Sequence, residues 1–147
     1  MLYEKYEKLQ AKERFEMTQN EPLAPRQKAF EKAAPKAKVI AHRGGAHLWP
    51  ENTLEAFEQA IKLGVHGLEF DLQLSKDGQL MVHHDSQLKP AGTRLAGSYL
   101  TAPTPRLDAL TGEQLQAYDV GRLAPETPEA RRRDQQSPTD GARLPYL

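Results

Sequence analysis

The chain has 147 residues, 38% of them hydrophobic and 27% charged, which suffices for one modest domain with its own core. Its 20 basic and 20 acidic residues cancel, so bulk charge predicts no nucleic-acid binding. The absence of cysteine excludes disulfides and thiolate metal sites.

The first 37 residues are typical of an extension that precedes the domain. Residues 2–17 carry only a thin apolar stripe, so we expect a solvated segment or a short amphipathic helix. Pro22, Pro25 and Pro35 then predict a linker. The segment is too charged for a secretory signal or a membrane span. We therefore expect a soluble cytoplasmic protein without a membrane span.

The next stretch predicts a strand, a glycine-rich turn, a helix and a second strand. Residues 39–41 form a short apolar run that ends at the sequence HRGG. Asn52 is a good N-cap for the helix, Glu55 completes a capping box, and Gly64 ends it. Residues 65–74 are typical of the second strand. This βαβ order predicts that the two strands are parallel.

A third strand is predicted to fold back on the second. Asp-Gly at positions 77–78 lies between two apolar runs, which is a strong hairpin signal, and residues 80–82 form the returning strand. With a two-residue turn, the register pairs Asp71 with His84 and brings that histidine against the preceding carboxylates. A slip of one residue would turn His84 to the other face of the sheet.

Glu69 and Asp71 lie two positions apart, so their side chains share one face of the second strand. Strands of a βαβ unit are usually covered on both faces, and two adjacent buried carboxylates repel each other unless a cation intervenes. Their oxygen atoms suit Mg²⁺ or Ca²⁺. The alternative is that both carboxylates lie on a solvent-exposed face.

His42 and His84 each follow an apolar run, and histidine is the side chain best suited to exchange protons near neutral pH. Arg43 offers a planar fork for phosphate oxygens, beside glycines whose N–H groups can approach an anion. The alternatives are a structural role for His42 and a salt bridge from Arg43 to Glu69 or Glu51.

The second half of the chain has weaker signals. Thr111 and Gln114 form a capping box for a helix through Tyr118. Residues 121–143 are rich in proline, arginine and aspartate and predict a long excursion with little core, and the arginines at 131–133 are interpreted as a solvated patch.

Five short motifs, in this order and spacing, resemble the glycerophosphodiester phosphodiesterase family. They are His42-Arg43-Gly44-Gly45, Pro50-Glu51-Asn52-Thr53, Glu69-Phe70-Asp71, Lys76-Asp77-Gly78 and His84-Asp85. The resemblance runs from about Lys38 to the end of the chain.

The resemblance implies an α/β fold of the TIM-type (β/α) barrel, with the site at the carboxyl ends of the strands. A full barrel needs about 250 residues. We therefore expect residues 38–147 to form the N-terminal part of such a barrel, in a truncated chain, after the extension of residues 1–37. An open sheet would leave an unpaired edge through which copies of the chain could associate.

The resemblance also implies metal-dependent hydrolysis of small-molecule glycerophosphodiesters to an alcohol and glycerol 3-phosphate. The implied roles are acid and base for His42 and His84, ligation of Mg²⁺ or Ca²⁺ by Glu69 and Asp71, phosphate binding by Arg43, and site shaping by Glu51 and Asn52, with Glu51 a candidate further ligand. The family's further acidic ligand lies beyond the end of this chain.

Two other functions stay open on the sequence. One is a related barrel phospholipase of the sphingomyelinase D type, which shares the pair of histidines and the carboxylate-bound metal. The other is an inactive, truncated remnant of the enzyme that folds poorly or binds a partner through its open edge.

Overall fold

The computed structural model describes residues 38–147, so the predicted N-terminal helix and linker lie outside the described part. In chain order its elements are β1 (Ile40–His42), α3 (Leu54–Lys62), β2 (Gly67–Glu69), β3 (Leu72–Leu74), β4 (Leu80–Val82), the 3₁₀ turn η1 (Pro90–Gly92), β5 (Arg94–Leu95), β6 (Ser98–Tyr99), the 3₁₀ turn η2 (Leu107–Ala109), α4 (Gly112–Leu115), β7 (Tyr118–Asp119) and α5 (Pro128–Arg132). None of the helices in this part of the chain is long and apolar enough to cross a bilayer.

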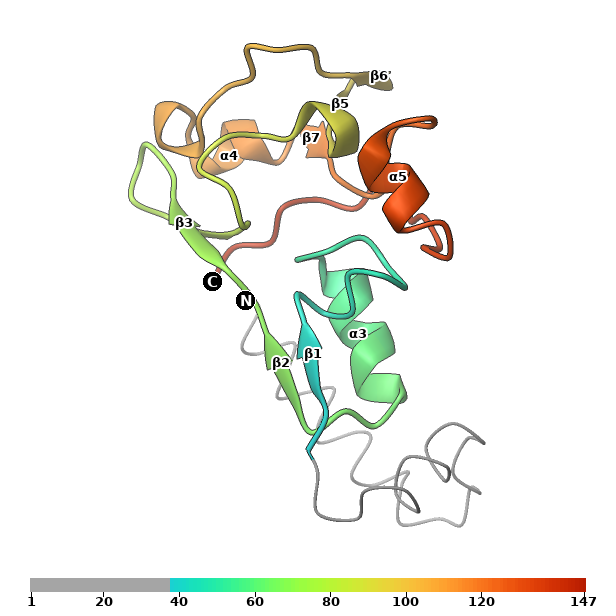
Figure 1. The fold of residues 1–147 in the computed structure, drawn as a ribbon. Helices are drawn as coiled ribbons and strands as arrows, with labels where there is room; N and C mark the ends of the chain where they lie inside the picture. The colour runs from blue at the N-terminus through green and yellow to red at the C-terminus, as the bar shows by residue number, and fades with distance from the viewer. Residues whose placement is uncertain (1–37) are drawn as a thin grey trace.

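The first three elements form the predicted βαβ unit. Strands β1 and β2 are parallel, with His42 opposite Glu69, and α3 lies alongside them (Figure 1). The helix buries Ala56, Phe57 and Ala60. The parallel pairing is confirmed, and it brings the polar carboxyl ends of both strands together.

Helix α3 begins one residue later than the sequence predicts. Thr53, not Asn52, is the N-cap, and its hydroxyl accepts a hydrogen bond from Ala56 N at 3.1 Å. Asn52 instead has a φ of +57° and uses its side chain elsewhere. Gly64, with a φ of +74°, follows the end of the helix as predicted.

The predicted hairpin register is wrong by one residue. Strands β3 and β4 are antiparallel, but Leu72 lies opposite Val82, and Asp71 O accepts a hydrogen bond from His83 N, not from His84. The turn has three residues, because Ser75 N bonds Gln79 O and Gly78 adopts a φ of +78°. A three-residue turn with a left-handed glycine shifts the pairing by one position relative to a two-residue turn.

The predicted second strand is also divided in two. Strand β2 ends at Glu69 and β3 begins at Leu72, so the carboxylate pair spans the break. Figure 1 shows β3 continuing away from β1, which ends at the same level as β2. The side chains of Glu69 and Asp71 therefore stand where regular pairing stops.

A second core forms around the other half of the chain. Met81, Leu88, Leu107, Leu115, Tyr118 and Leu144 form a buried cluster. The chain end returns to β4, where Val82 N donates to Pro145 O at 2.8 Å. Helix α4 has the predicted capping box of Thr111 and Gln114, but it ends at Leu115, and Tyr118 begins β7.

Residues 121–143 are tied to the rest of the chain more firmly than their composition indicates. Arg94 contacts both Asp119 and Asp140, and Arg122 contacts Asp140 at 2.7 Å. Gln136 Nε2 donates to Trp49 O at 3.0 Å. The ion pairs join residues 119–140 to β5, and the bond from Gln136 holds the segment after α5 beside the turn that follows β1.

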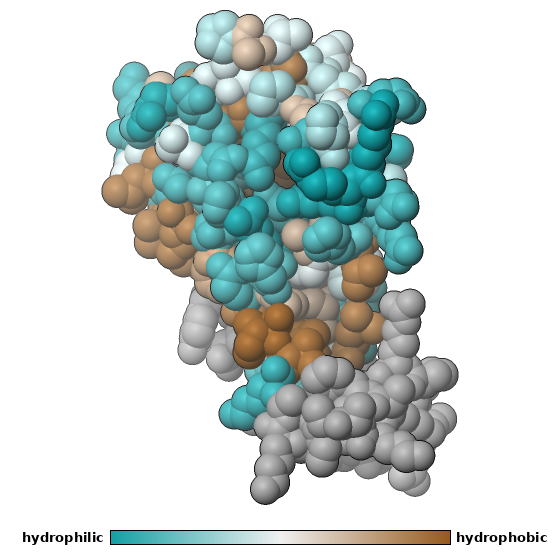
Figure 2. Space-filling model, viewed as in Figure 1, coloured by the Kyte–Doolittle hydropathy of each residue, from teal (hydrophilic) through white to brown (hydrophobic). Residues whose placement is uncertain are grey.

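The described strands form two two-stranded sheets and one three-stranded sheet, and in residues 38–147 they close no barrel. Apolar side chains remain at the surface of the hairpin: Leu74 is 56% exposed, and Leu72 and Leu80 are exposed as well. Figure 2 shows brown apolar surface on the flank that β3 occupies. Part of this sheet face is thus uncovered.

The turn after β1 packs Gly44 closely against Phe57 of α3. It has a φ of +76°, and a Cβ atom there would lie 2.7 Å from Cδ1 of Phe57. We expect Gly44→Ala to lower the free energy of unfolding by about 2–4 kcal/mol, from backbone strain and overpacking together. Gly78→Ala is the matched control, because Gly78 has a φ of +78° with nothing within 4 Å of the added carbon. Equal losses for both variants in urea denaturation would contradict the role of Phe57.

Candidate active site

The polar site begins where β1 and β2 end side by side. The parallel register sets His42 opposite Glu69, and their Nε2 and Oε2 atoms are 3.9 Å apart. The His42 side chain is 69% exposed, so the ring is open to a ligand from solvent. The parallel pairing that the sequence predicted is what brings this histidine and this carboxylate together at the strand ends.

Arg43 lies at the centre of the site because its backbone turns sharply after β1, with a φ of +52°. Its backbone N–H donates to Glu69 Oε2 at 3.0 Å, while its guanidinium turns to two other carboxylates. Nε lies 3.2 Å from Asp71 Oδ2, and Nη1 lies 3.3 Å from Glu51 Oε1. The predicted alternative of a salt bridge to Glu51 is thus present, and it leaves the phosphate role of Arg43 open.

Asn52 connects this turn to the carboxylate that follows β2. Its side-chain amide donates to Asp71 Oδ2 at 3.0 Å, and its carbonyl oxygen accepts from Asp71 N at 3.4 Å. Asn52 N donates to Arg43 O at 3.0 Å. With 2% of Asn52 exposed, this residue fixes Asp71 relative to Arg43.

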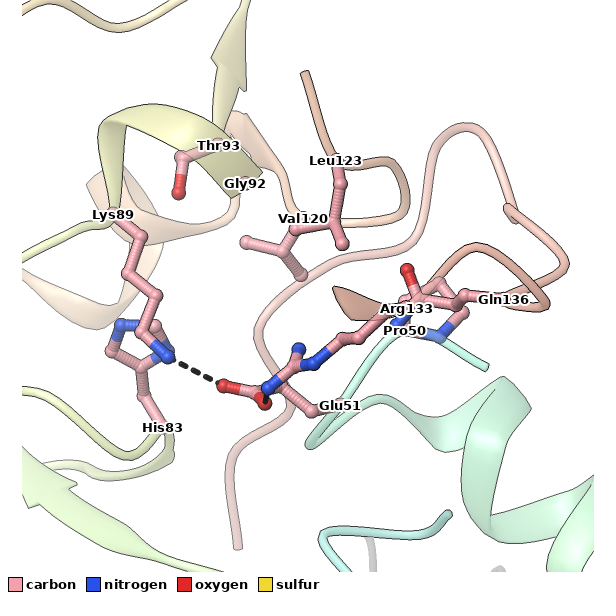
Figure 3. Close-up of a pocket in the computed structure, with 10 residues that line it drawn as sticks. All are labelled: Pro50, Glu51, His83, Lys89, Gly92, Thr93, Val120, Leu123, Arg133 and Gln136. Atoms are coloured by element: carbon pink, nitrogen blue, oxygen red, sulfur yellow. Dashed lines mark hydrogen bonds and ion pairs between the residues drawn. The ribbon is translucent and has the colours of Figure 1, made fainter. Parts of the chain in front are cut away.

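Glu51 is surrounded by three cations. Besides Arg43, Lys89 Nζ lies 2.6 Å from Oε1, and Arg133 Nη2 lies 2.6 Å from Oε2. Figure 3 shows the Lys89 and Arg133 side chains meeting at the Glu51 carboxylate. Burial alone would raise the pKa of Glu51, but the hydrogen bonds and charges of Lys89 and Arg133 outweigh it and lower the pKa to about 2. Glu51 is therefore ionised at every ordinary pH.

The two adjacent histidines have different environments. His83 is buried, its ring lies 3.3 Å from Gln87 O, and burial lowers its pKa, so it is neutral at pH 7. His84 is exposed, and its Nδ1 lies 2.5 Å from Asp85 Oδ1. Burial would raise the pKa of Asp85, but the hydrogen bond from His84 and the contact with Lys89 lower it. Because an ionised carboxylate only accepts, His84 donates from Nδ1 and keeps Nε2 free.

The predicted contact of His84 with the carboxylate pair is not made. No ion pair within residues 38–147 joins His84 to Glu69 or Asp71. The one-residue change of register is the reason, since it places His83 opposite Asp71. His84 is connected to the other groups indirectly, through Asp85 and Lys89.

The described residues contain no group of three or more His, Cys, Asp or Glu side chains placed to hold a metal ion. Glu69 and Asp71 both present oxygen atoms beside Arg43, and both are partly open to solvent. Two carboxylates suit a hard divalent cation but fill only part of its coordination shell. The residues present therefore fit part of a Mg²⁺ or Ca²⁺ site.

A sequence model of the Glycerophosphoryl diester phosphodiesterase family matches residues 42–146, which span every group described above. The chain belongs to this family. Its sequence is 56% identical over 50 residues to a glycerophosphodiester phosphodiesterase of Caldanaerobacter subterraneus, covering 34% of this chain and 21% of that protein. It is 41% identical over 97 residues to glycerophosphodiester phosphodiesterase 1 of Bos taurus, covering 65% of this chain and 26% of that protein.

Solved structures of the Glycerophosphoryl diester phosphodiesterase family share the fold. A glycerophosphoryl diester phosphodiesterase structure from Silicibacter pomeroyi superposes with a TM-score of 0.73 at 38% identity, over 76% of this chain and 38% of that one. A phosphodiesterase of Oleispira antarctica, in complex with the product sn-glycerol-3-phosphate, gives 0.54 at 26% identity, over 76% of this chain and 37% of that one. The chain spans between 21% and 38% of the length of these four relatives.

Sequence reasoning missed two residues of the site, Lys89 and Arg133. Arg133 belongs to the run interpreted as a solvated patch; Arg131 and Arg132 are exposed as expected, but Arg133 is 82 residues from Glu51 and bonds it. No local pattern identifies such a contact. Lys89 carried no signal either, because residues 85–89 are not helical and a spacing of four from Asp85 predicts a contact only on a helix.

Proposed function

We propose that this chain carries the phosphate-binding and proton-transfer part of a metal-dependent phosphodiesterase that hydrolyses glycerophosphodiesters to an alcohol and glycerol 3-phosphate. The observation that supports it most is the placement of His42, Arg43 and Glu69 together at the ends of two parallel strands, in a member of this family. The relative from Oleispira antarctica, whose structure holds sn-glycerol-3-phosphate, supports the same product.

In this proposal Arg43 binds the phosphate. A phosphodiester carries one negative charge and gains more on its equatorial oxygens as a nucleophile enters, so a cation placed there stabilises the transition state. Asp71 and Glu51 hold the guanidinium in place at 3.2 Å and 3.3 Å. The backbone N–H groups of Gly44 and Gly45 already bond Ala41 O and His42 O, so the side chain of Arg43 carries the contact.

His42 and His84 exchange protons with the substrate in this mechanism. One removes the proton from the nucleophile, either water or a neighbouring glycerol hydroxyl, and the other protonates the leaving oxygen. His42 is positioned beside Glu69, and Asp85 orients His84 so that Nε2 is free. Glu69 and Asp71 would hold the divalent cation, which would neutralise charge on the phosphate when bound.

We further propose that residues 38–147 are the N-terminal part of a (β/α) barrel and that residues 1–37 are an extension. The exposed Leu72, Leu74 and Leu80 support self-association of this chain through the uncovered hairpin face. Sedimentation at rising protein concentration tests it, and a monomer at all concentrations would contradict it. The cytoplasmic location stays a prediction.

The assay that tests the function is release of glycerol 3-phosphate from glycerophosphocholine by the 147-residue chain, with Mg²⁺ or Ca²⁺ and then with EDTA. We expect release that depends on the metal and is lost in the double variant Glu69→Ala, Asp71→Ala. Full activity in EDTA, or in the double variant, would contradict the proposed metal site.

The same assay separates the two alternatives. Faster hydrolysis of sphingomyelin or lysophospholipids than of glycerophosphocholine would favour the phospholipase. No release from a chain that unfolds cooperatively would favour the inactive remnant, which the open sheets and the incomplete set of metal ligands also support.

A further inference from the structure

Lys89 occupies an unusual place among the charged groups of the site. It lies directly before η1, after the buried Leu88, whose backbone N–H bonds Pro105 O at 3.0 Å. The base of its side chain is thereby anchored. Its Nζ reaches Glu51 Oε1 at 2.6 Å and Asp85 Oδ2 at 3.4 Å.

The two carboxylates that Lys89 joins belong to different halves of the site. Glu51 contacts Arg43, the proposed phosphate ligand, and Asp85 contacts His84, one of the proposed proton-transfer groups. Within residues 38–147, Lys89 is the one residue paired with both carboxylates.

Neutralising charge is an insufficient explanation for Lys89. Lys89 helps to lower the pKa of Glu51, but Arg43 and Arg133 also contact this carboxylate, so Lys89 is not its sole cationic partner. Asp85 already has His84. What Lys89 adds is a fixed connection between Glu51, which contacts Arg43, and Asp85, which contacts His84. The Glu51 end of this connection is shielded, at 13% exposure for Glu51 and 29% for Lys89, whereas Asp85 at the other end is 41% exposed.

We propose that Lys89 is a positioning residue: through Glu51 and Asp85 it fixes the guanidinium of Arg43 and the ring of His84 relative to each other. The roles of Arg43 and His84 rest on the proposed function, whereas the connection itself does not. Lys89 touches no substrate and takes no proton in this account. Its effect is to hold two groups at one spacing, which sets how well both act on a phosphodiester.

The connection can be tested without any activity. In the full chain labelled with ¹⁵N-arginine, Asp85→Asn perturbs one end of the connection, and the Arg43 Nε–H signal reports the other. We expect Asp85→Asn to move the Arg43 signal when Lys89 is present and to leave it in place in a Lys89→Met background. Lys76→Met, at an exposed turn position, is the matched control and should leave the response intact.

A kinetic measurement tests the consequence. We expect Lys89→Met to lower kcat for glycerophosphocholine by about 10- to 100-fold, as outer partners of a site commonly do, with KM changed less than about threefold. Lys89→Arg retains the charge and should recover part of kcat. A residue that only stabilises the fold would lower the unfolding midpoint and leave kcat of the folded fraction unchanged.

Each outcome decides the proposal. An Arg43 signal that responds equally with and without Lys89, or in neither case, overturns it whether or not the chain is active. If the Arg43 signal stops responding to Asp85→Asn in the Lys89→Met background but Lys89→Met leaves kcat unchanged, the proposal is also overturned. A chain that shows the connection but releases no glycerol 3-phosphate supports the proposal on Lys89 and contradicts the proposed function.

Discussion

Alanine at His42 or at His84 is expected to lower the rate of glycerol 3-phosphate release by about 10²- to 10⁴-fold. Each histidine is assigned one proton transfer, and without it the nucleophile or the leaving oxygen must exchange its proton with water. Neither replacement should disturb the fold: the His42 side chain is 69% exposed, and His84 is exposed too. We expect each to change the free energy of unfolding by about 0.5 kcal/mol or less.

His47→Ala is the matched control for the histidine variants, because His47 is exposed in the turn after β1 and has no assigned role. It should keep the full rate. Initial rates measured with saturating Mg²⁺ for all three variants give the comparison. A variant of His42 or His84 that retains the rate of the parent chain would remove that residue from the mechanism, and loss in His47→Ala would indicate a disturbed turn.

The parts of the fold that the sequence predicted correctly are those that neighbouring residues determine. Parallel pairing of the first two strands follows from the helix between them, which begins after its N-cap Thr53 and ends before Gly64. The meeting of His42 with Glu69 follows from that pairing. The order of five short motifs was sufficient for the family, which the match over residues 42–146 confirms.

The errors arise where two local choices were nearly equal. Asn52 and Thr53 are both good N-caps, and the contact of Asn52 with Asp71 decides between them. A two-residue turn and a three-residue turn both accommodate Asp-Gly, and the left-handed Gly78 closes the longer one. That one residue separates His84 from the carboxylates.

The contacts of Lys89 and Arg133 could not be predicted for a different reason. They depend on the packing of segments 38 and 82 residues away from Glu51 in sequence. Arg133, unlike its two neighbours, lies beyond the last residue of α5, and Gln136 holds the segment that follows beside residues 46–49. Such a contact is a property of the assembled fold and has no signature in the sequence around it.

Glu51→Gln is expected to destabilise the chain by about 3 kcal/mol at about pH 7. The carboxylate is 13% exposed and lies among Arg43, Lys89 and Arg133, and glutamine leaves three neighbouring cations without their shared anion. The lowered pKa gives the same magnitude: a fall from 4.5 to about 2 corresponds to about 3 kcal/mol of preference for the ionised form in the folded state.

The lowered pKa of Glu51 also predicts how the free energy of unfolding changes with pH. Because the pKa of Glu51 is lower in the folded chain than its ordinary value of 4.5, the unfolded chain binds a proton first as the pH falls. The stabilisation is therefore complete above about pH 5 and is lost progressively toward about pH 2. Urea denaturation of the parent chain and of Glu51→Gln should give free energies of unfolding that differ most at neutral pH and converge in acid.

Glu113→Gln is the control for this comparison, since Glu113 is exposed on α4 and should change stability by about 0.5 kcal/mol or less. A difference between the parent chain and Glu51→Gln that stays constant from neutral pH into acid would mean that the carboxylate acts through its shape, not its charge. In that case the three cations do not need an anion between them, and the placement of Arg43 must come from Asp71 and from the backbone turn at Gly44.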